Sequence, residues 1–275
     1  MGRSIIILRA GPSSLHPSWV GGGPERGWDL LLCPYAETGF ASDPARGVSL
    51  GPVRPSAKWT GLRELLTGWD GWRDYDYVLL PDDDIIAPEA TWTEFFAHCR
   101  ALDARLAAPA LEPGSFHSHL VTMRNESFDA RRVGFVEIMT PCFRTDVLAE
   151  LLPTLALSET GWGWGLDLLW PKLLGYEGLY TIDATPVLHT RPVGLDRGSA
   201  LGARVLAEMQ GIIARHGLEW VHRCFAGILP SGEAMDADAA GFLEAYVAGY
   251  WYLVGGDRRG LAGLLSAQCG VPLAA

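Results

Sequence analysis

Short apolar runs of strand length alternate with segments of helical periodicity over most of the chain, from about residue 4 to residue 190. The runs are rich in Ile, Leu, Val and aromatic residues, and clusters of Gly, Pro and Ser separate many of them. We expect strands over residues 4–8, 28–33, 75–80, 105–108, 133–139 and 179–182. Alternation of this kind predicts an α/β fold with a mixed, mostly parallel sheet that is flanked by helices.

Helical patterns lie between these runs and continue beyond them. After Pro88, a residue that suits the first turn of a helix, apolar residues recur at helical spacing, so we expect one face of this helix to be buried. These residues are Trp92, Phe95, Phe96, Cys99 and Leu102. The expected helices span residues 58–66, 88–102, 145–152, 165–174, 199–213 and 236–253. Because the last 80 or so residues show helical patterns, we expect residues 196–275 to form a helical extension packed on the sheet.

Composition narrows the class of protein. The chain has 275 residues, 48% of them hydrophobic, which is ample for a packed core, but no run of about 18 apolar residues that would predict a membrane span. Its five cysteines are scattered and form no Cys-x-x-Cys pair, so we expect a reducing cytoplasm rather than a disulfide framework or a structural zinc site. The formal net charge of −10 speaks against a nucleic-acid partner, although a bound cation would still allow an anionic nucleotide.

The expected strand over residues 75–80 ends in three adjacent carboxylates, Asp82, Asp83 and Asp84. Extended residues alternate between faces, so Asp82 and Asp84 can point one way while Asp83 points the other. Like charges this close repel one another, and a divalent cation removes that cost. Mg²⁺ and Mn²⁺ prefer carboxylate and phosphate oxygens, which predicts a platform for a metal and a diphosphate. The alternative is a solvated acidic turn.

A second unusual stretch is the alternation of Gly and Trp over residues 161–165, followed by Asp167. Glycine lets the backbone bend sharply, and Trp162 and Trp164 would present flat rings on which a sugar can stack. Asp167 lies near the start of an expected helix, where the helix dipole favours a carboxylate. The segment therefore predicts a sugar platform with a base beside it, or else a tight turn that buries both Trp and uses Asp167 as a helix-start residue.

His189 and Glu137 complete the candidate residues that follow from the sequence alone. His189 follows the strand expected over residues 179–182, and a neutral imidazole is a good metal ligand, although a hydrogen-bonded structural His is the alternative. Glu137 lies on the strand expected over residues 133–139 and would reach an acceptor if its face lined a cleft. If that face met solvent instead, Glu137 would be an ordinary surface acid.

These motifs together resemble GT-A-fold glycosyltransferases, which combine a hydrophobic strand ending in Asp-x-Asp with a later acidic segment and a His. The Gly-Trp-Gly-Trp-Gly segment is similar to that of the β-1,4-galactosyltransferases. The runs Leu-Arg-Ala-Gly-Pro-Ser-Ser-Leu-His-Pro-Ser-Trp, Tyr-Asp-Tyr-Val-Leu-Leu-Pro-Asp-Asp-Asp and Gly-Trp-Gly-Leu-Asp also resemble an uncharacterised glycosyltransferase-like family, labelled domain of unknown function 707. The resemblance covers about residues 4–195.

The resemblance implies a GT-A-like catalytic domain over residues 1–195, a nucleoside-diphosphate sugar as donor, and Mn²⁺ or Mg²⁺ as the cation. It implies that Asp82 and Asp83 lie nearest the ribose and the metal, and that Asp84 and His189 are metal ligands. Asp82 is a further expected metal ligand. Arg9, Lys58 and Arg191 are candidate contacts to the diphosphate or the base of the nucleotide.

On the acceptor side, the resemblance makes Asp167 the catalytic base or a hydrogen-bond partner of the acceptor. The galactosyltransferase pattern continues with several acids after the last Gly, whereas here Leu166 precedes a single Asp, so both roles stay open. Trp162, Trp164 and Glu137 are the expected acceptor contacts.

The predicted function is therefore a metal-dependent transfer of a sugar from a nucleoside diphosphate to an acceptor hydroxyl. Two other classes of protein stay open. A metal-dependent phosphoesterase would use the three Asp to activate water, and a non-catalytic protein would bind the sugar nucleotide without turnover. The sequence does not identify the donor sugar or the acceptor. It also does not show whether the transfer inverts or retains the anomeric centre, or how many copies of the chain assemble.

Overall fold

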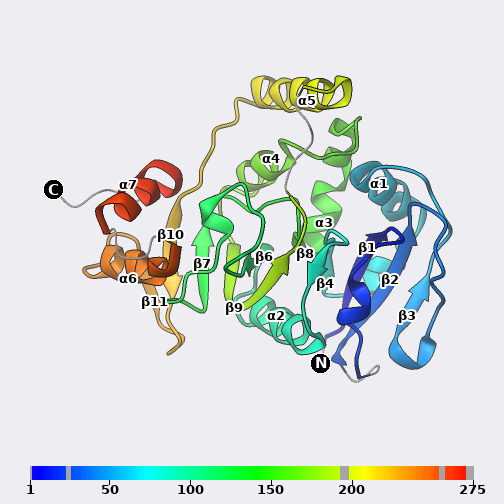
Figure 1. Cartoon of the computed structure of the whole chain (residues 1–275), viewed down its shortest axis with the longest axis horizontal. Helices are drawn as coiled ribbons and strands as arrows, with labels where there is room; N and C mark the ends of the chain where they lie inside the picture. The colour runs from blue at the N-terminus through cyan, green and yellow to red at the C-terminus, as the bar shows by residue number, and fades with distance from the viewer. Residues whose placement is uncertain (1, 23–25, 193–197, 254–257, 271–275) are drawn as a thin grey trace.

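The computed structural model describes residues 2–22, 26–192, 198–253 and 258–270 (Figure 1). Four strands in the N-terminal half pair in parallel in the order β4-β1-β2-β3. Their bounds are β1 (Ser4–Ala10), β2 (Trp28–Pro34), β3 (Val48–Leu50) and β4 (Tyr77–Leu79). Every residue of β1 is buried, which explains why it reads as a continuous apolar run rather than an alternating one.

The other half of the sheet is mostly antiparallel. Only β6 and β9 pair in parallel there, and the whole order among the described residues is β11-β10-β7-β9-β6-β8-β4-β1-β2-β3, with β5 paired to β9 beside this path. The bounds are β5 (Ile85–Ile86), β6 (Leu106–Leu111), β7 (Ala130–Val133), β8 (Cys142–Arg144), β9 (Leu179–His189), β10 (Cys224–Ile228) and β11 (Ala234–Asp236). The sheet is mixed, as predicted, but it is not mostly parallel. Four of the ten strand pairings among the described residues are parallel, and three of these four lie in the N-terminal half.

Helices pack around this sheet. The α-helices are α1 (Lys58–Gly68), α2 (Glu89–Ala101), α3 (Thr145–Leu151), α4 (Leu166–Leu173), α5 (Ala200–His216), α6 (Phe242–Gly249) and α7 (Arg258–Cys269). Short 3₁₀ helices span His16–Ser18, Pro44–Arg46, Asp70–Asp74, Leu120–Thr122, Leu152–Leu157 and Trp251–Leu253. Helix α2 packs against β9, α1 against β1, and α5 against α4, while α6 and α7 lie together beside β10 and β11 (Figure 1). None of the helices in the described ranges is long and apolar enough to span a membrane.

The stripe predicted for the helix after Pro88 is confirmed for its first four residues, Trp92, Phe95, Phe96 and Cys99, which are all buried on α2. Its last member, Leu102, follows the end of α2 and is only partly buried. Three strand predictions were wrong in their bounds. Residues 133–139 do not form a strand, since β7 ends at Val133 and the chain then leaves the sheet. Pro109 lies inside β6, next to an irregular step in its pairing with β9, and β9 continues past residue 182 to His189.

The C-terminal residues contain strands that their helical patterns did not predict. After α5, the chain returns to the sheet as β10, which pairs antiparallel with β7, and β11 then pairs with β10. Only part of the segment expected to be helical over residues 236–253 becomes α6. The division into a catalytic domain over residues 1–195 and an extension over residues 196–275 stays a prediction.

A buried ion pair ties these C-terminal elements to the centre of the sheet. Arg131 on β7 and Asp183 on β9 are both fully buried, and the Arg131 Nε atom lies 2.8 Å from Asp183 Oδ2. Arg131 also donates to the hydroxyl of Tyr250, which follows α6, and to the carbonyls of Val121 and Met123. Burial alone would lower the pKa of Arg131, but the Asp183 carboxylate and the nearby tyrosines raise it well above its ordinary value. Burial raises the pKa of Asp183, and the Arg131 guanidinium opposes that shift.

Candidate active site

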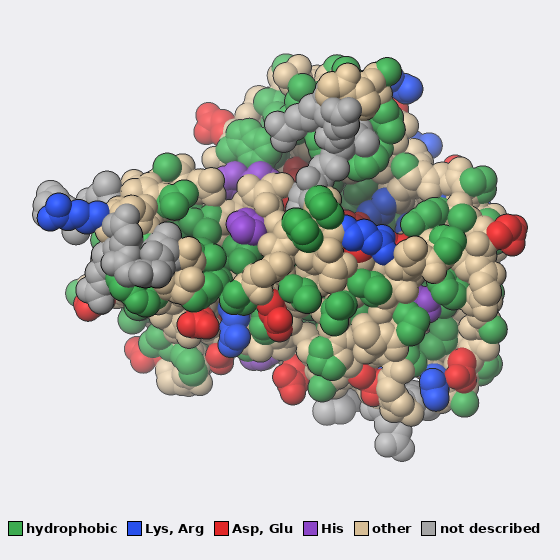
Figure 2. Space-filling view, viewed as in Figure 1, with side chains coloured by type: hydrophobic (Ala, Val, Ile, Leu, Met, Phe, Trp, Pro, Cys, Tyr) green, Lys and Arg blue, Asp and Glu red, His purple; other side chains and the backbone are tan. Residues whose placement is uncertain are grey.

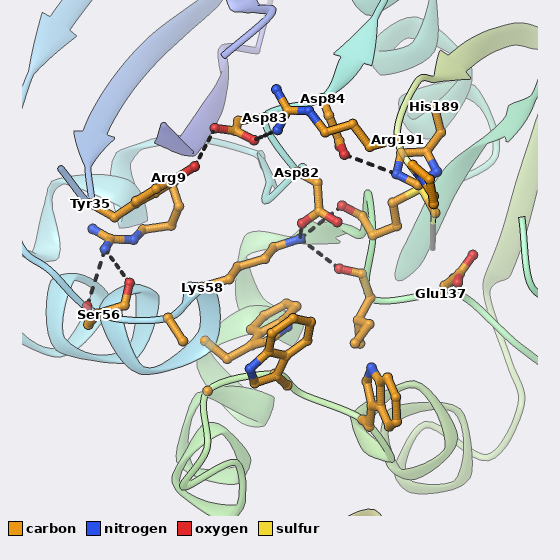
Figure 3. Close-up of a pocket in the computed structure, with 18 residues that line it drawn as sticks. Arg9, Tyr35, Ser56, Lys58, Asp82, Asp83, Asp84, Glu137, His189 and Arg191 are labelled. Atoms are coloured by element: carbon orange, nitrogen blue, oxygen red, sulfur yellow. Dashed lines mark hydrogen bonds and ion pairs between the residues drawn. The ribbon is translucent and has the colours of Figure 1, made fainter. Parts of the chain in front are cut away.

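A cavity of about 520 Å³ opens where β1, β2 and β4 end and the loops that follow them converge (Figure 3). Ligands of open α/β sheets bind outside the carboxyl ends of strands, and the cavity lies there. Basic and acidic side chains come together at a hollow between α5 and the body of the molecule (Figure 2). The structure gathers ten of the residues singled out from the sequence in the lining: Arg9, Lys58, Asp82, Asp83, Asp84, Glu137, Trp162, Trp164, His189 and Arg191.

The three adjacent carboxylates contact different parts of the protein. Asp82 Oδ1 lies 2.6 Å from the Lys58 ammonium. Asp84 Oδ2 lies 3.3 Å from His189 Nε2. The carboxylate of Asp83 accepts hydrogen bonds from a backbone N–H and two side chains: those of Gly11, Tyr35 and Arg191. The backbone turns at Asp83 and Asp84 instead of continuing as a strand, so each carboxylate meets partners on different elements, while Asp82 and Asp84 both line the cavity.

A two-residue ladder brings Asp84 to His189, although the two are about a hundred positions apart. Strand β5 begins directly after Asp84 and pairs antiparallel with the end of β9, with Ile85 opposite His189. The Asp84 carbonyl also accepts hydrogen bonds from the backbone and the hydroxyl of Thr190. The buried indole of Trp19 holds the other side of β5 by donating to the Ile85 carbonyl at 2.8 Å.

The hydrogen bonding of His189 leaves one ring nitrogen facing Asp84. Nδ1 lies 2.7 Å from the carbonyl oxygen of Phe116, and because a carbonyl only accepts, Nδ1 carries a proton. Nε2 then faces Asp84 either as a second N–H or as a bare lone pair. Burial lowers the pKa of His189, but the bonds to Asp84 and Phe116 more than offset this and raise it overall. Burial likewise favours the neutral form of Asp84, yet His189 and Arg191 lower its pKa.

The pair formed by Asp84 and His189 fits a divalent cation. Asp84 Oδ1 is buried and has no hydrogen-bond partner among the described residues, so one carboxylate oxygen is unused. A His that binds a metal usually donates its other N–H to a carbonyl or carboxylate, as His189 does to Phe116. Neighbouring ligands of an octahedral Mg²⁺ at 2.0–2.1 Å lie about 3 Å apart, close to the 3.3 Å found here.

The described part of the chain holds no group of three or more His, Cys, Asp or Glu residues that would form a complete protein site. Asp82, a predicted third ligand, is paired with Lys58 instead. A cation at Asp84 and His189 would therefore take its remaining ligands from water or from a bound phosphate, which is how Mg²⁺ is commonly held.

Lys58 joins three parts of the cavity wall. It lies at the first position of α1, and its ammonium donates to Asp82 Oδ1 and to the carbonyls of Ile138 and Met139 at 2.6, 2.8 and 2.9 Å. Burial lowers the pKa of Lys58, and the three carboxylates oppose that shift, Asp82 most strongly. With three acceptors on its three protons, Lys58 fixes the wall rather than offering a free charge to a ligand.

The two arginines of the lining, Arg9 and Arg191, differ in how many of their hydrogen bonds are made within the protein. Arg9, at the end of β1, donates to the carbonyls of Cys33, Arg54 and Ser56, so it holds the loop that precedes α1. Arg191 is partly exposed, and its two NH groups donate to Asp83 and to the Ser13 carbonyl. Of the two guanidinium groups, that of Arg191 is the more open to the cavity.

The Gly-Trp segment bends at every glycine. Gly161, Gly163 and Gly165 have φ angles of 75°, 77° and 94°, in the left-handed region that only glycine adopts without strain. This conformation places the half-buried Trp162 and Trp164 in the cavity lining. Support for the bend comes from α5, where Glu208 accepts hydrogen bonds from the backbone and the hydroxyl of Thr160.

Replacing Gly163 with Ala is expected to destabilise the protein by about 3 kcal/mol. About 1 kcal/mol comes from the left-handed backbone, and the rest from a Cβ atom that would lie 2.3 Å from the indole of Trp59. Gly175→Ala is the matched control, because Gly175 has a φ of 65° but open space around its Cβ position. Urea unfolding should give a markedly larger loss for Gly163→Ala, and equal losses would contradict the Trp59 contact.

Asp167, the predicted catalytic base, is not among the residues that line the cavity. It lies in the first turn of α4, and its Oδ1 accepts a hydrogen bond from the Gly165 N–H at 3.2 Å. The carboxylate thus turns back to the start of its own helix. Burial raises the pKa of Asp167 to about 7, although these backbone N–H groups oppose the shift.

Glu137 does line the cavity, on the irregular segment that follows β7. Burial, followed by the charge of Asp167, raises its pKa to about 8. Two lining residues with hydroxyl groups, Tyr35 and Ser56, were missed in the sequence. Tyr35 directly follows β2, so the rule that sites gather where parallel strands end would have found it.

Comparison with solved structures places this geometry in a known fold. GalNAc-T7, solved with UDP, GalNAc and Mn²⁺, is similar over 78% of this chain and 48% of its own, with a TM-score of 0.52 and 11% sequence identity. The fold is of the GT-A type. TarS of S. aureus is similar over 78% of this chain and 72% of its own, at a TM-score of 0.47 and 11% identity.

The sequence matches no family model and no curated protein. The finer resemblances, to the family labelled domain of unknown function 707 and to the Gly-Trp-Gly segment of β-1,4-galactosyltransferases, are therefore not shown. The chain corresponds to about half the length of GalNAc-T7, so the likeness concerns the GT-A fold and not the whole of that protein.

Proposed function

We propose that this protein is a metal-dependent glycosyltransferase that moves a sugar from a nucleoside-diphosphate sugar to an acceptor hydroxyl. The observation that carries the proposal is the pair formed by Asp84 and His189 in the cavity wall, with one unused carboxylate oxygen and an imidazole already oriented by Phe116. The GT-A fold supports it, and GalNAc-T7, which shares that fold, was solved with a nucleoside diphosphate and Mn²⁺.

The arrangement of the lining gives the donor a direction. Arg9, Tyr35 and Ser56 lie on one side of the cavity, and His189 and Glu137 lie on the other (Figure 3). We place the nucleoside on the first side and the sugar beside Glu137 and the two Trp of the Gly-Trp segment. The diphosphate then lies between them, within reach of Arg191 and of a cation held by Asp84 and His189.

When bound there, a Mn²⁺ or Mg²⁺ ion would neutralise the charge that develops on the departing diphosphate. The protein's own part is to orient the donor. His189 is fixed by the Phe116 carbonyl, Asp84 by the ladder between β5 and β9, and Arg191 would meet a phosphate oxygen while keeping its contact to Asp83. Trp162 and Trp164 would stack against the sugar and hold it in place beside Glu137.

A phosphoesterase that activates water between three aspartates fits the structure less well. The three carboxylates diverge to Lys58, to the partners of Asp83 and to His189. Such a mechanism needs several carboxylates around one metal cluster, and no such cluster occurs in the described ranges.

The location of the protein in the cytoplasm stays a prediction.

Mn²⁺ and UDP together are expected to raise the melting temperature, whereas UDP alone should raise it little. A ligand that binds only the folded state stabilises it by RT ln(1 + [L]/Kd), about 2.7 kcal/mol at a hundred times Kd, which corresponds to several degrees. Thermal shifts with UDP, GDP, CMP and their sugars, each with and without Mn²⁺, give the measurement. No metal-dependent shift with any nucleotide at millimolar concentration would overturn the proposal.

A further inference from the structure

Glu137 is a carboxylate in the cavity wall that the fold itself does not use. The residue is 9% exposed and lines the cavity, and no hydrogen bond or ion pair to its carboxylate occurs within residues 2–22, 26–192, 198–253 and 258–270. A carboxylate this buried is costly to ionise without a partner, and a catalytic role is one of the reasons for which native proteins keep such a group. Glu137 is thus available to a ligand in the cavity.

The backbone around Glu137 is held firmly in place. The next two carbonyls, of Ile138 and Met139, accept hydrogen bonds from the Lys58 ammonium, and the Met139 carbonyl also accepts one from the Asp82 N–H at 2.8 Å. These contacts join the segment to α1 and to the acidic loop that precedes β5. The carboxyl group is therefore positioned by rigid elements, as a group that must meet a substrate hydroxyl should be.

Four charged groups on four different elements act on Glu137. Asp167 from α4 and Asp82 from the loop after β4 disfavour its ionised form, while His189 from β9 and Lys58 from α1 favour it. Burial is the largest influence, and the pKa of about 8 that results lies close to neutral pH. A general base works best when its pKa is near the working pH, because it is then both available and strong enough.

We propose that Glu137, and not Asp167, removes the proton from the acceptor hydroxyl. The assignment rests on the function proposed above. The acceptor oxygen forms a bond to the anomeric carbon of the donor sugar, and the bond from that carbon to the diphosphate oxygen breaks. The diphosphate leaves with the electron pair of that bond, and the acceptor proton moves to Glu137, which later releases it to solvent. This is a direct displacement and inverts the anomeric centre.

Asp167 then acts as a positioning residue. Its carboxylate accepts the Gly165 N–H, and so holds the last bend of the Gly-Trp segment against the start of α4. Its charge also raises the pKa of Glu137. Removing that charge should move the titration of Glu137 to lower pH without removing the base itself.

The test measures UDP release from UDP-glucose, UDP-galactose, UDP-GlcNAc and UDP-GalNAc with Mn²⁺ and with water as the acceptor. Glu137→Gln should lower kcat by about 10² to 10⁴ while the KM for the donor stays within a few-fold. In the wild type, kcat should rise with pH up to about 8 and then level off, because Glu137 must be ionised to accept a proton. The variant should lack this rise.

Asp167→Asn is the matched variant, since it also changes a buried carboxylate to an amide. It should keep kcat within about tenfold and shift the rise of kcat to lower pH. A loss of rate in Asp167→Asn with retention in Glu137→Gln would overturn the assignment, and so would a wild type that binds UDP with Mn²⁺ but releases none from any donor. Calorimetric binding of UDP, GDP and CMP with Mn²⁺ to all three proteins separates these results from failure of the proposed function, in which the wild type would bind none of the three nucleotides.

Discussion

Replacing His189 with Ala, or Asp84 with Asn, is expected to weaken the Mn²⁺-dependent part of UDP binding by at least about 100-fold. On the proposed function, these two side chains would be the protein ligands of the cation. Loss of one would then leave the other as an incomplete site. Substitutions that only disturb the support of a metal ligand already cost about 10- to 100-fold, so removal of a ligand should cost more. Isothermal titration with UDP at fixed Mn²⁺ measures the effect.

His117→Ala provides the control for His189→Ala. The ring of His117 also contacts a backbone carbonyl, that of Ser115, but the residue is exposed and is not part of the cavity lining. Its removal should leave Mn²⁺-dependent UDP binding unchanged. Equal Mn²⁺ dependence in the wild type and in His189→Ala would exclude His189 as a metal ligand.

The largest effect on stability is expected for Arg131→Met, about 3–5 kcal/mol. The substitution leaves the Asp183 carboxylate fully buried without its counter-charge, and it also removes the donors to Tyr250 and to two carbonyls. The melting temperature should fall by about 10 °C or more. Guanidinium unfolding followed by tryptophan fluorescence is suitable, because the chain has 11 Trp.

Arg132→Met tests whether burial is the cause. Arg132 is the next residue on β7, but its side chain is 42% exposed and lies 3.7 Å from Asp236, so its loss should change stability by less than about 0.5 kcal/mol. Combining Arg131→Met with Asp183→Asn should restore part of the stability, since the unpaired charge is then removed. A small effect of Arg131→Met alone would show that the ion pair does not hold β7 to β9.

Several residues of the cavity lining were found in the sequence because they follow strong local patterns. The apolar run that becomes β4 leads to Asp82, Asp83 and Asp84, and alternating glycines mark the bend that presents Trp162 and Trp164. Such patterns arise because the burial of a strand and the conformation of a bend restrict which residue types fit within a short stretch of sequence. The α/β class and the buried face of α2 follow from periodicity in the same way.

The remaining features depend on tertiary contacts that no local pattern encodes. Strand β5 has only two residues and is defined by its pairing with β9, so periodicity could not reveal it. Strand β9 contains Asp183 and Pro186, which are rare in strands, yet pairing with three neighbours keeps it extended to His189. Asp167 is absent from the cavity lining because its carboxylate turns back to the first turn of α4, and the spacing of the motif alone does not show this.

The ladder between β5 and β9 has a consequence for how the protein would respond to chelators. Asp84 and His189 bracket more than a third of the chain, and two backbone pairings together with the contacts of Thr190 join the ends of that segment. An ion held by both side chains would act as a reversible cross-link that closes this long loop, much as a metal clip does. Removal of the ion by a chelator would then loosen the end of β9 first. The lining of the cavity would become disordered under conditions in which the rest of the sheet is still folded.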